Sequence, residues 1–440
     1  MSDPSHSASA DIDIVVVGAG LVGVTSALAL ARQGHRVLVL DTQEPGRGAS
    51  YGNAGHLATE QVFPIADASI LKSLPGMLMD PMGPLRLDWK YLPRALPWLT
   101  QLVLNLRPAP FRQSVAGIRA LNERSLAAWQ RLLASVDSVH LLKVGGSLLV
   151  YEKPESRQKL AALESRMREQ QVPVEWWERE TIQRAAPQLS EDLLGGLFFP
   201  ATGHVLDPWR VVTTLVEAAR RQGVRFAQET VRSAQVVESG VRLVTDSQQL
   251  VARQVLIACG AHSAALTAQL TGKRVPLDTE RGYHLMLPRE HNRLPFAVTS
   301  LERRFIMTPM ETGLRLAGTV EFAGLHAPPN MARAWQLHHL SRGLFKADLD
   351  VEGATPWMGF RPSLPDSLPI IDHVYGGRVL LAFGHHHLGL TQSAITAELI
   401  ADLAGPSEHG APVTSIDREN LPPLEPYRLA RFGQAGSRYR

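Results

Sequence analysis

Three glycines at the start of the chain have the spacing of a phosphate-binding turn: Gly18, Gly20 and Gly23. In such a G-x-G-x-x-G turn the first glycine permits a tight bend, the second lets the backbone approach a pyrophosphate, and the third allows close helix–strand packing. Backbone amides at the helix N-terminus then face the phosphate charge. Asp41 supplies a carboxylate that can accept hydrogen bonds from a ribose diol. This chemistry predicts a dinucleotide site, for FAD or for NAD.

The segments around these residues supply the elements that must position them. Residues 12–17 form a β-branched apolar run, typical of a strand buried on both faces. Residues 24–33 are rich in Ala and Leu with helical spacing, and residues 37–40 form a second apolar strand directly before Asp41. The pattern therefore predicts a complete βαβ unit and not an isolated glycine turn.

Other segments carry residues that suit a flat cofactor and an acidic ligand. The small-residue loop 46–56 can pass closely over a planar ring system. Arg361 can hold a carboxylate through two parallel hydrogen bonds of its planar guanidinium. Three consecutive histidines occupy 385–387, but consecutive side chains point in different directions and no nearby acid or cysteine completes a ligand set. We therefore predict no metal site.

Five ordered blocks resemble the FAD-dependent amino-acid oxidoreductases of the D-amino-acid oxidase superfamily, and most closely the bacterial D-amino-acid dehydrogenases. They are the loop 46–56 with its Ala-Ser and Asn-x-Gly elements, 203–208 with the helix-like segment 209–222, the strand and glycine turn 255–263, the Arg-Pro-x-x-Pro-Asp segment within 359–371, and the Gly-His-x-x-x-Gly-x-Thr turn 384–391. The resemblance covers most of the chain. It implies FAD as the cofactor.

The resemblance also implies which residues surround the cofactor. The expected FAD-binding residues are Gly18, Gly20, Leu21, Val22, Gly23, Asp41, Ala49, Ser50, Asn53, Gly55, His56, Val231, Ala258, Gly260, Arg361, Gly384, His385, His387, Leu388, Gly389, Leu390 and Thr391. A helix that starts near Thr391 would direct its positive end at the flavin pyrimidine and stabilise the reduced flavin. Cys259, the single cysteine, falls at the adenosine end, so non-covalent FAD is expected.

Four residues are candidates for contact with a substrate. Arg361 is expected to bind the carboxylate, and Tyr283 resembles a strand tyrosine of the family whose hydroxyl could add a second contact. Arg281 and His56 are weaker pocket candidates. The implied reaction is hydride transfer from the α-carbon of a deprotonated amine to flavin N5, which needs orientation and electrostatics more than a strong protein base.

The order of the blocks predicts a mixed α/β fold with two domains. A discontinuous Rossmann-type FAD domain of the glutathione-reductase type comprises 11–60, 203–263 and 374–405. A substrate domain on a mixed β-sheet comprises 61–202 and 264–373, and 406–440 is expected to be an extended surface tail. Within the second domain, 85–112 mixes leucines and aromatic residues with basic ones, which suits a membrane contact, a lid or a subunit interface.

Composition limits the partners. The net charge of +3 gives no reason to expect nucleic acid, and one cysteine excludes an intramolecular disulfide framework. No signal peptide or spanning segment is visible, which predicts a cytoplasmic protein that could lie peripherally on the inner face of the inner membrane.

The substrate remains open at this stage. With one carboxylate clamp and no evident acidic residue for a cationic side chain, we expect neutral or cyclic D-amino acids, such as D-proline or 4-hydroxy-D-proline. Electrons would pass to a quinone or another redox carrier. The alternatives are an oxygen-using oxidase of glycine, sarcosine or another secondary amine, and a non-catalytic electron-relay subunit.

Overall fold

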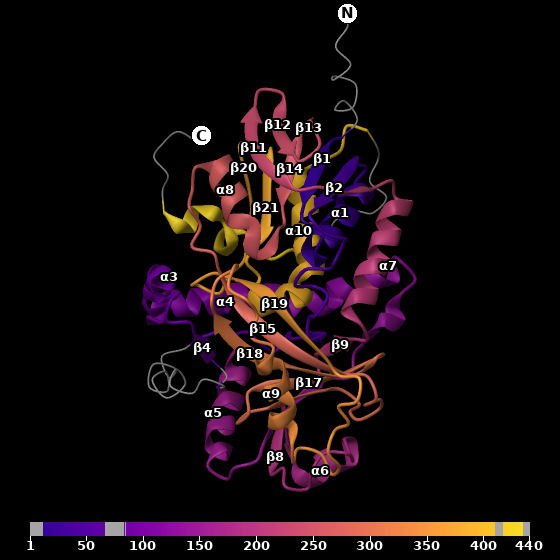
Figure 1. Ribbon diagram of the computed structural model, residues 1–440, viewed down its shortest axis with the longest axis vertical. Coiled ribbons are helices and arrows are strands. Elements are labelled where there is room, and N and C mark those ends of the chain that lie inside the picture. The colour runs from indigo at the N-terminus through magenta and orange to yellow at the C-terminus, as the bar shows by residue number, and fades with distance from the viewer. Residues whose placement is uncertain (1–11, 67–82, 84, 410–416, 434–440) are drawn as a thin grey trace, which may run out of the picture.

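A six-stranded sheet forms the centre of the upper lobe in Figure 1. The computed structural model describes residues 12–66, 83, 85–409 and 417–433. All neighbouring strands of this sheet are parallel except the last pair. In spatial order the strands are β10 (Arg225–Gln228), β2 (Val37–Asp41), β1 (Ile14–Val17), β14 (Gln254–Ile257), β21 (Val379–Phe383) and β20 (Ile370–Val374).

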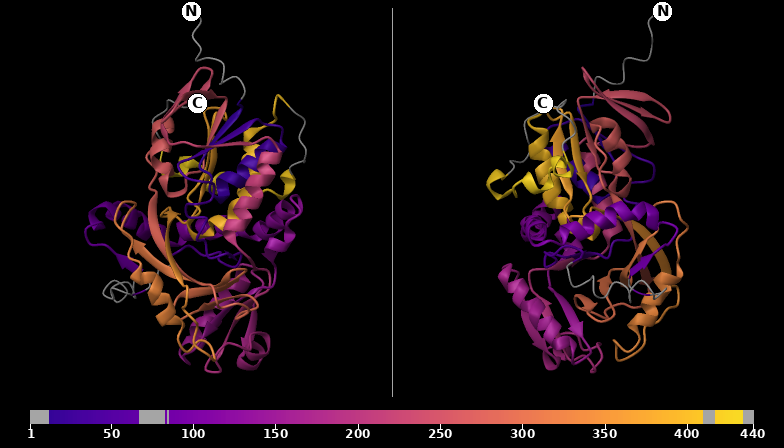
Figure 2. Two further views of the ribbon diagram at one scale, coloured as in Figure 1. Left: turned by 45° about the vertical axis from the view of Figure 1, so that its right-hand side comes forward. Right: turned by 90° about the vertical axis from the view of Figure 1, so that its left-hand side faces the viewer.

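Both faces of this sheet are covered by other elements, which agrees with the apolar residue at every position of β1. Ile14 and Val16 pack toward the helices, whereas Val15 and Val17 pack toward the opposite layer. The helical layer contains α1 (Leu21–Arg32), α4 (Pro108–Ala134), α7 (Pro208–Arg221) and α10 (Gly389–Ala404). The opposite layer contains α8 (Ser263–Thr271) and an antiparallel meander of β11 (Val231–Val237), β12 (Gly240–Thr245) and β13 (Gln249–Ala252), which Figure 2 shows at the top of the molecule.

The lower lobe is built on a nine-stranded mixed sheet. Most of its pairs are antiparallel, but β16 pairs with β6, and β18 with β4, in parallel. The strands along the path are β19 (Thr355–Ser363), β15 (Asp278–Leu287), β18 (Gly313–Phe322), β17 (Phe305–Met310), β16 (Ala297–Ser300), β6 (Ser147–Tyr151), β8 (Gly195–Phe199) and β7 (Glu175–Glu178), with β4 (Leu85–Leu87) beside β18. The predicted mixed sheet is thus confirmed.

The remaining elements surround this sheet or join the lobes. A small sheet of β3 (His56–Leu57), β9 (Gly203–Val205) and β5 (Leu142–Lys143) lies where the chain passes between the lobes. The other helices are α3 (Leu92–Asn105), α5 (Ser156–Glu169), α6 (Arg179–Ala185) and α9 (Ala332–Ser341). Strand β19 contacts the short turns that follow β14 and β21, so the nine-stranded sheet meets the carboxyl ends of two central strands.

Two segments pack differently from the sequence expectation. Helix α4, expected in the substrate domain, packs on α10 of the six-stranded lobe and crosses the molecule between the lobes in Figure 1. The described part of the tail, 417–433, is not simply an extended surface segment. The Tyr427 side chain is fully buried and its hydroxyl donates to the Gly117 carbonyl at 2.7 Å. The amphipathic sequence of α4 did not specify which lobe its apolar face would cover.

Candidate active site

The glycine turn lies at the carboxyl end of β1 and is shaped by close backbone approach. Gly18 has φ +110°, and a Cβ there would come within 2.4 Å of the Ala258 carbonyl oxygen. A Cβ on Gly23 would lie 1.9 Å from the Gly18 oxygen, so only glycine lets α1 approach the turn. The first turn of α1 carries no acidic side chain, and its Leu21 amide donates to Ser50 Oγ at 2.9 Å. The turn therefore leaves a helix N-terminus suited to a pyrophosphate.

Residues expected around the adenosine end gather at the same edge of the sheet. Asp41 ends β2, where its carboxylate accepts from the Ala19 amide at 2.6 Å and from the Gln43 amide at 3.0 Å. Ala258 follows β14 and donates its amide to the Val17 carbonyl at 2.8 Å. Cys259 donates its thiol to the same carbonyl at 3.1 Å, and burial raises the pKa of that thiol to about 12. Cys259 is thus a protonated thiol beside the glycine turn.

Segment 384–391 runs from the end of β21 into the first turn of α10 and is held from several sides. Gly384 has φ +86°, and a Cβ there would come within 2.4 Å of the Leu364 side chain. Thr391 Oγ1 accepts from the Ala58 amide at 2.9 Å, and the Leu390 carbonyl accepts from the Trp129 indole at 2.8 Å. His385 is buried, lies 3.0 Å from Thr396 Oγ1, and has its pKa lowered by burial to about 3. It is therefore neutral.

The next two histidines of that loop point to different surroundings. His386 is buried with φ +52°, and its Nε2 accepts from the Leu364 amide at 3.1 Å. His387 is exposed, and its Nε2 lies 2.6 Å from Gln61 Oε1. The His387 side chain is therefore accessible and lies beside Gln61. Within the described residues there is no group of three His, Cys, Asp or Glu side chains that could hold a metal ion.

Arg361 lies on β19, opposite Glu280 of β15, and its side chain is partly exposed. Its guanidinium covers Gly282, where a Cβ would come within 2.3 Å of Nη2, and Nη1 donates to the Thr319 carbonyl at 3.1 Å. Across the described part of the chain, Arg361 has no ion-pair partner. Burial acts to lower the pKa of this guanidinium, with the negative charge of Glu280 opposing that change. The geometry leaves guanidinium N–H groups able to bind an external carboxylate.

Tyr283 and Arg281 are not brought to Arg361. Because side chains alternate along a strand, both lie on the face of β15 opposite to Glu280 and Gly282. The Tyr283 hydroxyl donates to Glu321 at 2.6 Å and accepts from the Asn330 amide.

Arg281 is fully buried and its side chain is committed to other groups. It donates to four carbonyls, those of Ala323, Gly324, Ala327 and Pro328. The expected carboxylate contact of Tyr283 and the expected pocket position of Arg281 therefore do not fit this structure, since both polar groups are already engaged on the other face of the sheet.

His56 also has structural partners. Its Nδ1 donates to the Gly203 carbonyl at 3.1 Å and its Nε2 lies 3.0 Å from Glu60 Oε1. Burial acts to lower the pKa of His56, but the charge and hydrogen bond of Glu60 outweigh burial and raise it. Across the strand, burial and the charge of His56 lower the pKa of His204 to about 4. Both ring nitrogens of His56 are thus engaged, by the Gly203 carbonyl and by Glu60.

Several neighbours of the loop 46–56 escaped the sequence reasoning. The Trp357 indole covers Gly52, where a Cβ would approach ring carbons within 2.2 Å, and stacks on His284 at 5.0 Å. His284 Nδ1 donates to the Gly52 carbonyl at 2.9 Å, and Arg315 donates to the Asn53 carbonyl at 2.6 Å. These groups fix the loop against β15, β18 and β19. These side chains reach the loop only because distant strands pair in the sheet, and a single sequence does not reveal that pairing.

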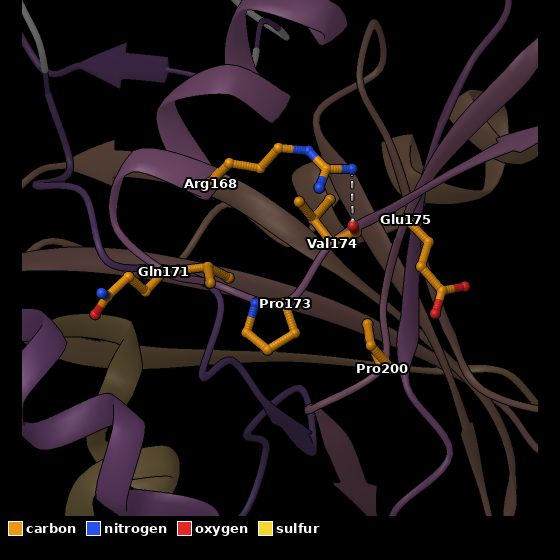
Figure 3. Close-up of a pocket in the computed structure, with 7 residues that line it drawn as sticks. Arg168, Gln171, Pro173, Val174, Glu175 and Pro200 are labelled. Atoms are coloured by element: carbon orange, nitrogen blue, oxygen red, sulfur yellow. Dashed lines mark hydrogen bonds between the residues drawn. The ribbon is translucent and has the colours of Figure 1, made fainter.

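A surface hollow elsewhere on the lower lobe contains none of the predicted residues. Figure 3 shows Arg168 donating to the Val174 carbonyl, at 3.4 Å, on its rim. Its lining consists of Arg168, Gln171, Val172, Pro173, Val174, Glu175 and Pro200. Because these side chains lie on α5, β7 and the turns near them, the hollow is separate from the glycine turn and Arg361.

Residues 13–403 match the family model described as FAD dependent oxidoreductase, the D-amino-acid oxidase family. The chain therefore belongs to this family of FAD-dependent enzymes. The glycine turn, the α1 N-terminus and Asp41 fit the dinucleotide part of FAD. Gly18 and Gly23 pack the turn tightly against protein backbone, whereas a Cβ on Gly20 would meet only Ser50 Oγ, at 3.3 Å, so the backbone there is open to a pyrophosphate.

Curated relatives extend over nearly the whole chain. A D-amino-acid oxidase from Bradyrhizobium diazoefficiens is 35% identical over 89% of this chain and 94% of its own. A D-amino acid dehydrogenase from Rhizobium johnstonii is 30% identical over 89% of this chain and 95% of its own. Among solved structures, glycine oxidase from Geobacillus kaustophilus matches with a TM-score of 0.72 at 22% identity, covering 96% of this chain and 98% of its own. That last likeness supports the fold.

Proposed function

We propose that this protein oxidises the carbon–nitrogen bond of a D-amino acid whose carboxylate binds Arg361. The observation that carries the proposal is a partly exposed guanidinium, without an ion-pair partner among the described residues, on the sheet that meets the cofactor lobe. Free carboxylates match the planar fork of such a group. The names of the two relatives above, a D-amino-acid oxidase and a D-amino acid dehydrogenase, support the substrate class.

The chain's own residues would bind and orient the substrate. Arg361 holds the carboxylate, and its bond to the Thr319 carbonyl restricts the guanidinium to the surface of Gly282. Fixing the carboxylate fixes the α-carbon, which is the main contribution of such a clamp to the rate. When bound at the glycine turn, FAD would supply the two-electron chemistry as the hydride acceptor. The amine must be deprotonated for this step, and the imino acid product hydrolyses to a 2-oxo acid when it is acyclic.

We propose a neutral or cyclic substrate, with D-proline and 4-hydroxy-D-proline as the first compounds to test. The charged groups near Arg361 support this choice. Glu280 is buried, with 1% of its surface exposed, so it offers no accessible carboxylate to a cationic side chain. Neutral side chains demand no such partner. We also propose that FAD binds non-covalently, because the Cys259 thiol donates to the Val17 carbonyl beside the glycine turn.

We also propose that electrons pass to a quinone and that α3 touches an anionic membrane surface. Trp89 and Leu96 are 58% and 56% exposed, and Val103 and Leu104 are also exposed. Basic residues flank this patch: Arg86, Lys90, Arg94, Arg107 and Arg112. Such a combination suits the lipid boundary. No helix within the described residues is long and apolar enough to span a membrane.

Trp98 is not part of that surface. It is buried against Phe322, with its indole donating to the Ser363 carbonyl at 3.1 Å. A vesicle test should therefore mutate Trp89 and Leu96 to serine, with Trp335→Ser on α9 as the control, because Trp335 is an exposed tryptophan of another helix. Loss of sedimentation with anionic vesicles in the double variant alone supports the contact. Equal sedimentation of all three proteins contradicts it.

The decisive experiment for the activity is anaerobic reduction of the purified holoenzyme. Panels of D- and L-amino acids are added while the flavin absorbance is followed, and then oxygen or a quinone analogue is supplied. We expect bleaching by neutral or cyclic D-amino acids and reoxidation by the quinone. No bleaching by any amino acid contradicts the function, bleaching by L-forms only contradicts the stereochemistry, and rapid reoxidation by oxygen alone favours the oxidase alternative.

A further inference from the structure

Glu280 places a buried negative charge beside Arg361, and the proposed reaction does not use it. The two residues are direct cross-strand partners on β15 and β19, so their side chains leave the same face of the sheet. The Cβ atoms of such partners lie about 5 Å apart. The guanidinium nevertheless extends over Gly282 toward the Thr319 carbonyl and forms no ion pair with Glu280. Its N–H groups are thus left for another acceptor.

The Glu280 carboxylate is only partly satisfied by hydrogen bonds. Its Oε1 accepts from the Ser363 hydroxyl at 2.6 Å, whereas its Oε2 has no partner within the described structure. His386 Nδ1 lies 3.9 Å from Oε1 and likewise has no partner there. Burial opposes ionisation of Glu280, whereas the hydrogen bond from the Ser363 hydroxyl and the charge of Arg361 favour it. A donor hydroxyl and a guanidinium on the same face of the sheet suit the carboxylate form of this residue.

The neighbouring histidines do not neutralise this anion. The Leu364 amide can only donate, so Nε2 of His386 must accept, and the ring is neutral with its proton on Nδ1. His284 lies on the same face, and burial lowers its pKa to about 3. Among the described groups around Glu280, the full positive charge is therefore that of Arg361.

We propose that Glu280 is an internal counter-anion that weakens the affinity of Arg361 for carboxylates and disfavours substrates with a second acidic group. This inference rests on the proposed carboxylate-binding role of Arg361. Glu280 acts through Arg361 as a positioning residue and does not touch the substrate. A carboxylate bound to Arg361 lies near the buried Glu280 carboxylate, and like charges repel more strongly where one of them is shielded from solvent. The repulsion favours release of the 2-oxo acid, and an acidic side chain would add a third negative charge.

The test compares carboxylate binding by holoenzyme variants. Benzoate, a monocarboxylate that cannot be oxidised at an amine, is titrated while the flavin spectrum is followed. We expect Glu280→Gln to lower the dissociation constant about tenfold. Glu280→Asp, which keeps the charge, should stay close to wild type. Glu321→Gln is the matched control, because Glu321 is a buried carboxylate of the same sheet on the opposite face. A general packing defect would weaken binding instead of strengthening it.

Two further measurements keep the inference separable from the proposed function. If Arg361→Ala leaves benzoate binding unchanged, the clamp itself is wrong. If that variant loses binding but Glu280→Gln shows an unchanged or raised dissociation constant, only the counter-anion is wrong. Should Glu280→Gln fail to fold, wild type is titrated with benzoate and with the dicarboxylate phthalate. Equal affinity for the two ligands overturns the inference, and at least tenfold weaker phthalate binding is expected.

Discussion

Arg361 and Arg281 lie on neighbouring strands of one sheet, yet their guanidinium groups have opposite environments. Arg281 is fully buried and donates to four carbonyls, and it lies 3.7 Å from Glu321. Arg361 is partly exposed and donates to one carbonyl. The difference arises from strand alternation, which places the two side chains on opposite faces. Residue type alone therefore does not identify a binding arginine. The two differ in how many guanidinium N–H groups already donate to protein acceptors.

The largest expected effect is on stability, from Arg281→Ala. Removal of this guanidinium takes a donor from four carbonyls and the neighbouring positive charge from Glu321, which should lower the free energy of unfolding by about 3–5 kcal/mol. Urea denaturation followed by tryptophan fluorescence measures the change. A loss below about 1 kcal/mol would show that the carbonyls find other donors, and the contrast with Arg361 would fail.

The second effect is on catalysis, from Arg361→Ala. Loss of a charge-assisted hydrogen bond to the substrate should weaken carboxylate binding by about 1.5–3 kcal/mol, or roughly 10- to 150-fold in kcat/KM. The free energy of unfolding should fall less than in Arg281→Ala, because the side chain closes only the Thr319 bond, although Glu280 also loses its neighbouring positive charge. Arg361→Lys should recover part of the loss, since a single ammonium cannot form the bidentate pair. An unchanged saturation curve removes Arg361 from the site.

The third effect, from Tyr283→Phe, tests whether the polar groups on this face of β15 contribute to stability and not to substrate binding. Its hydroxyl lies behind the sheet with Glu321 and the Asn330 amide, so its removal should cost about 1–3 kcal/mol of stability and leave kcat/KM within about twofold. Thermal unfolding and steady-state kinetics on the same preparation separate the two effects. A large rise in KM with unchanged stability would show that the Tyr283 hydroxyl contacts the substrate.

The smallest effect is a pH dependence of stability from His56. Its folded-state pKa is raised, so the His56–Glu60 pair stabilises fully below the ordinary histidine pKa of 6.5 and loses this contribution as pH rises through the folded-state value. Wild-type unfolding free energy should therefore decline on the alkaline side of pH 6.5, by about 1 kcal/mol. His56→Gln should flatten that decline. Identical slopes for both proteins would mean that the pair does not titrate.

Much of the cofactor lobe was predictable because the sequence patterns that indicate it are local. The turn at Gly18 and Gly23, the strand before it and Asp41 all follow from backbone sterics and buried-strand composition within thirty or so residues. Strand β21 was also placed correctly, at 379–383, whereas the turn after it is shorter than expected, because α10 already begins at Gly389. The domain to which α4 belongs was not, because an amphipathic helix does not specify its partner.

The sequence by itself determined the dinucleotide turn, the mixed sheet and the identity of Arg361 as a candidate clamp, since each rests on residue type and short-range spacing. Only the tertiary structure decided that Tyr283 and Arg281 face away from it and that Glu280 lies opposite it. Those decisions depend on the register between β15 and β19, whose paired residues Glu280 and Arg361 are far apart along the chain. A one-residue shift of register would exchange the two faces, and no local pattern in the sequence specifies it.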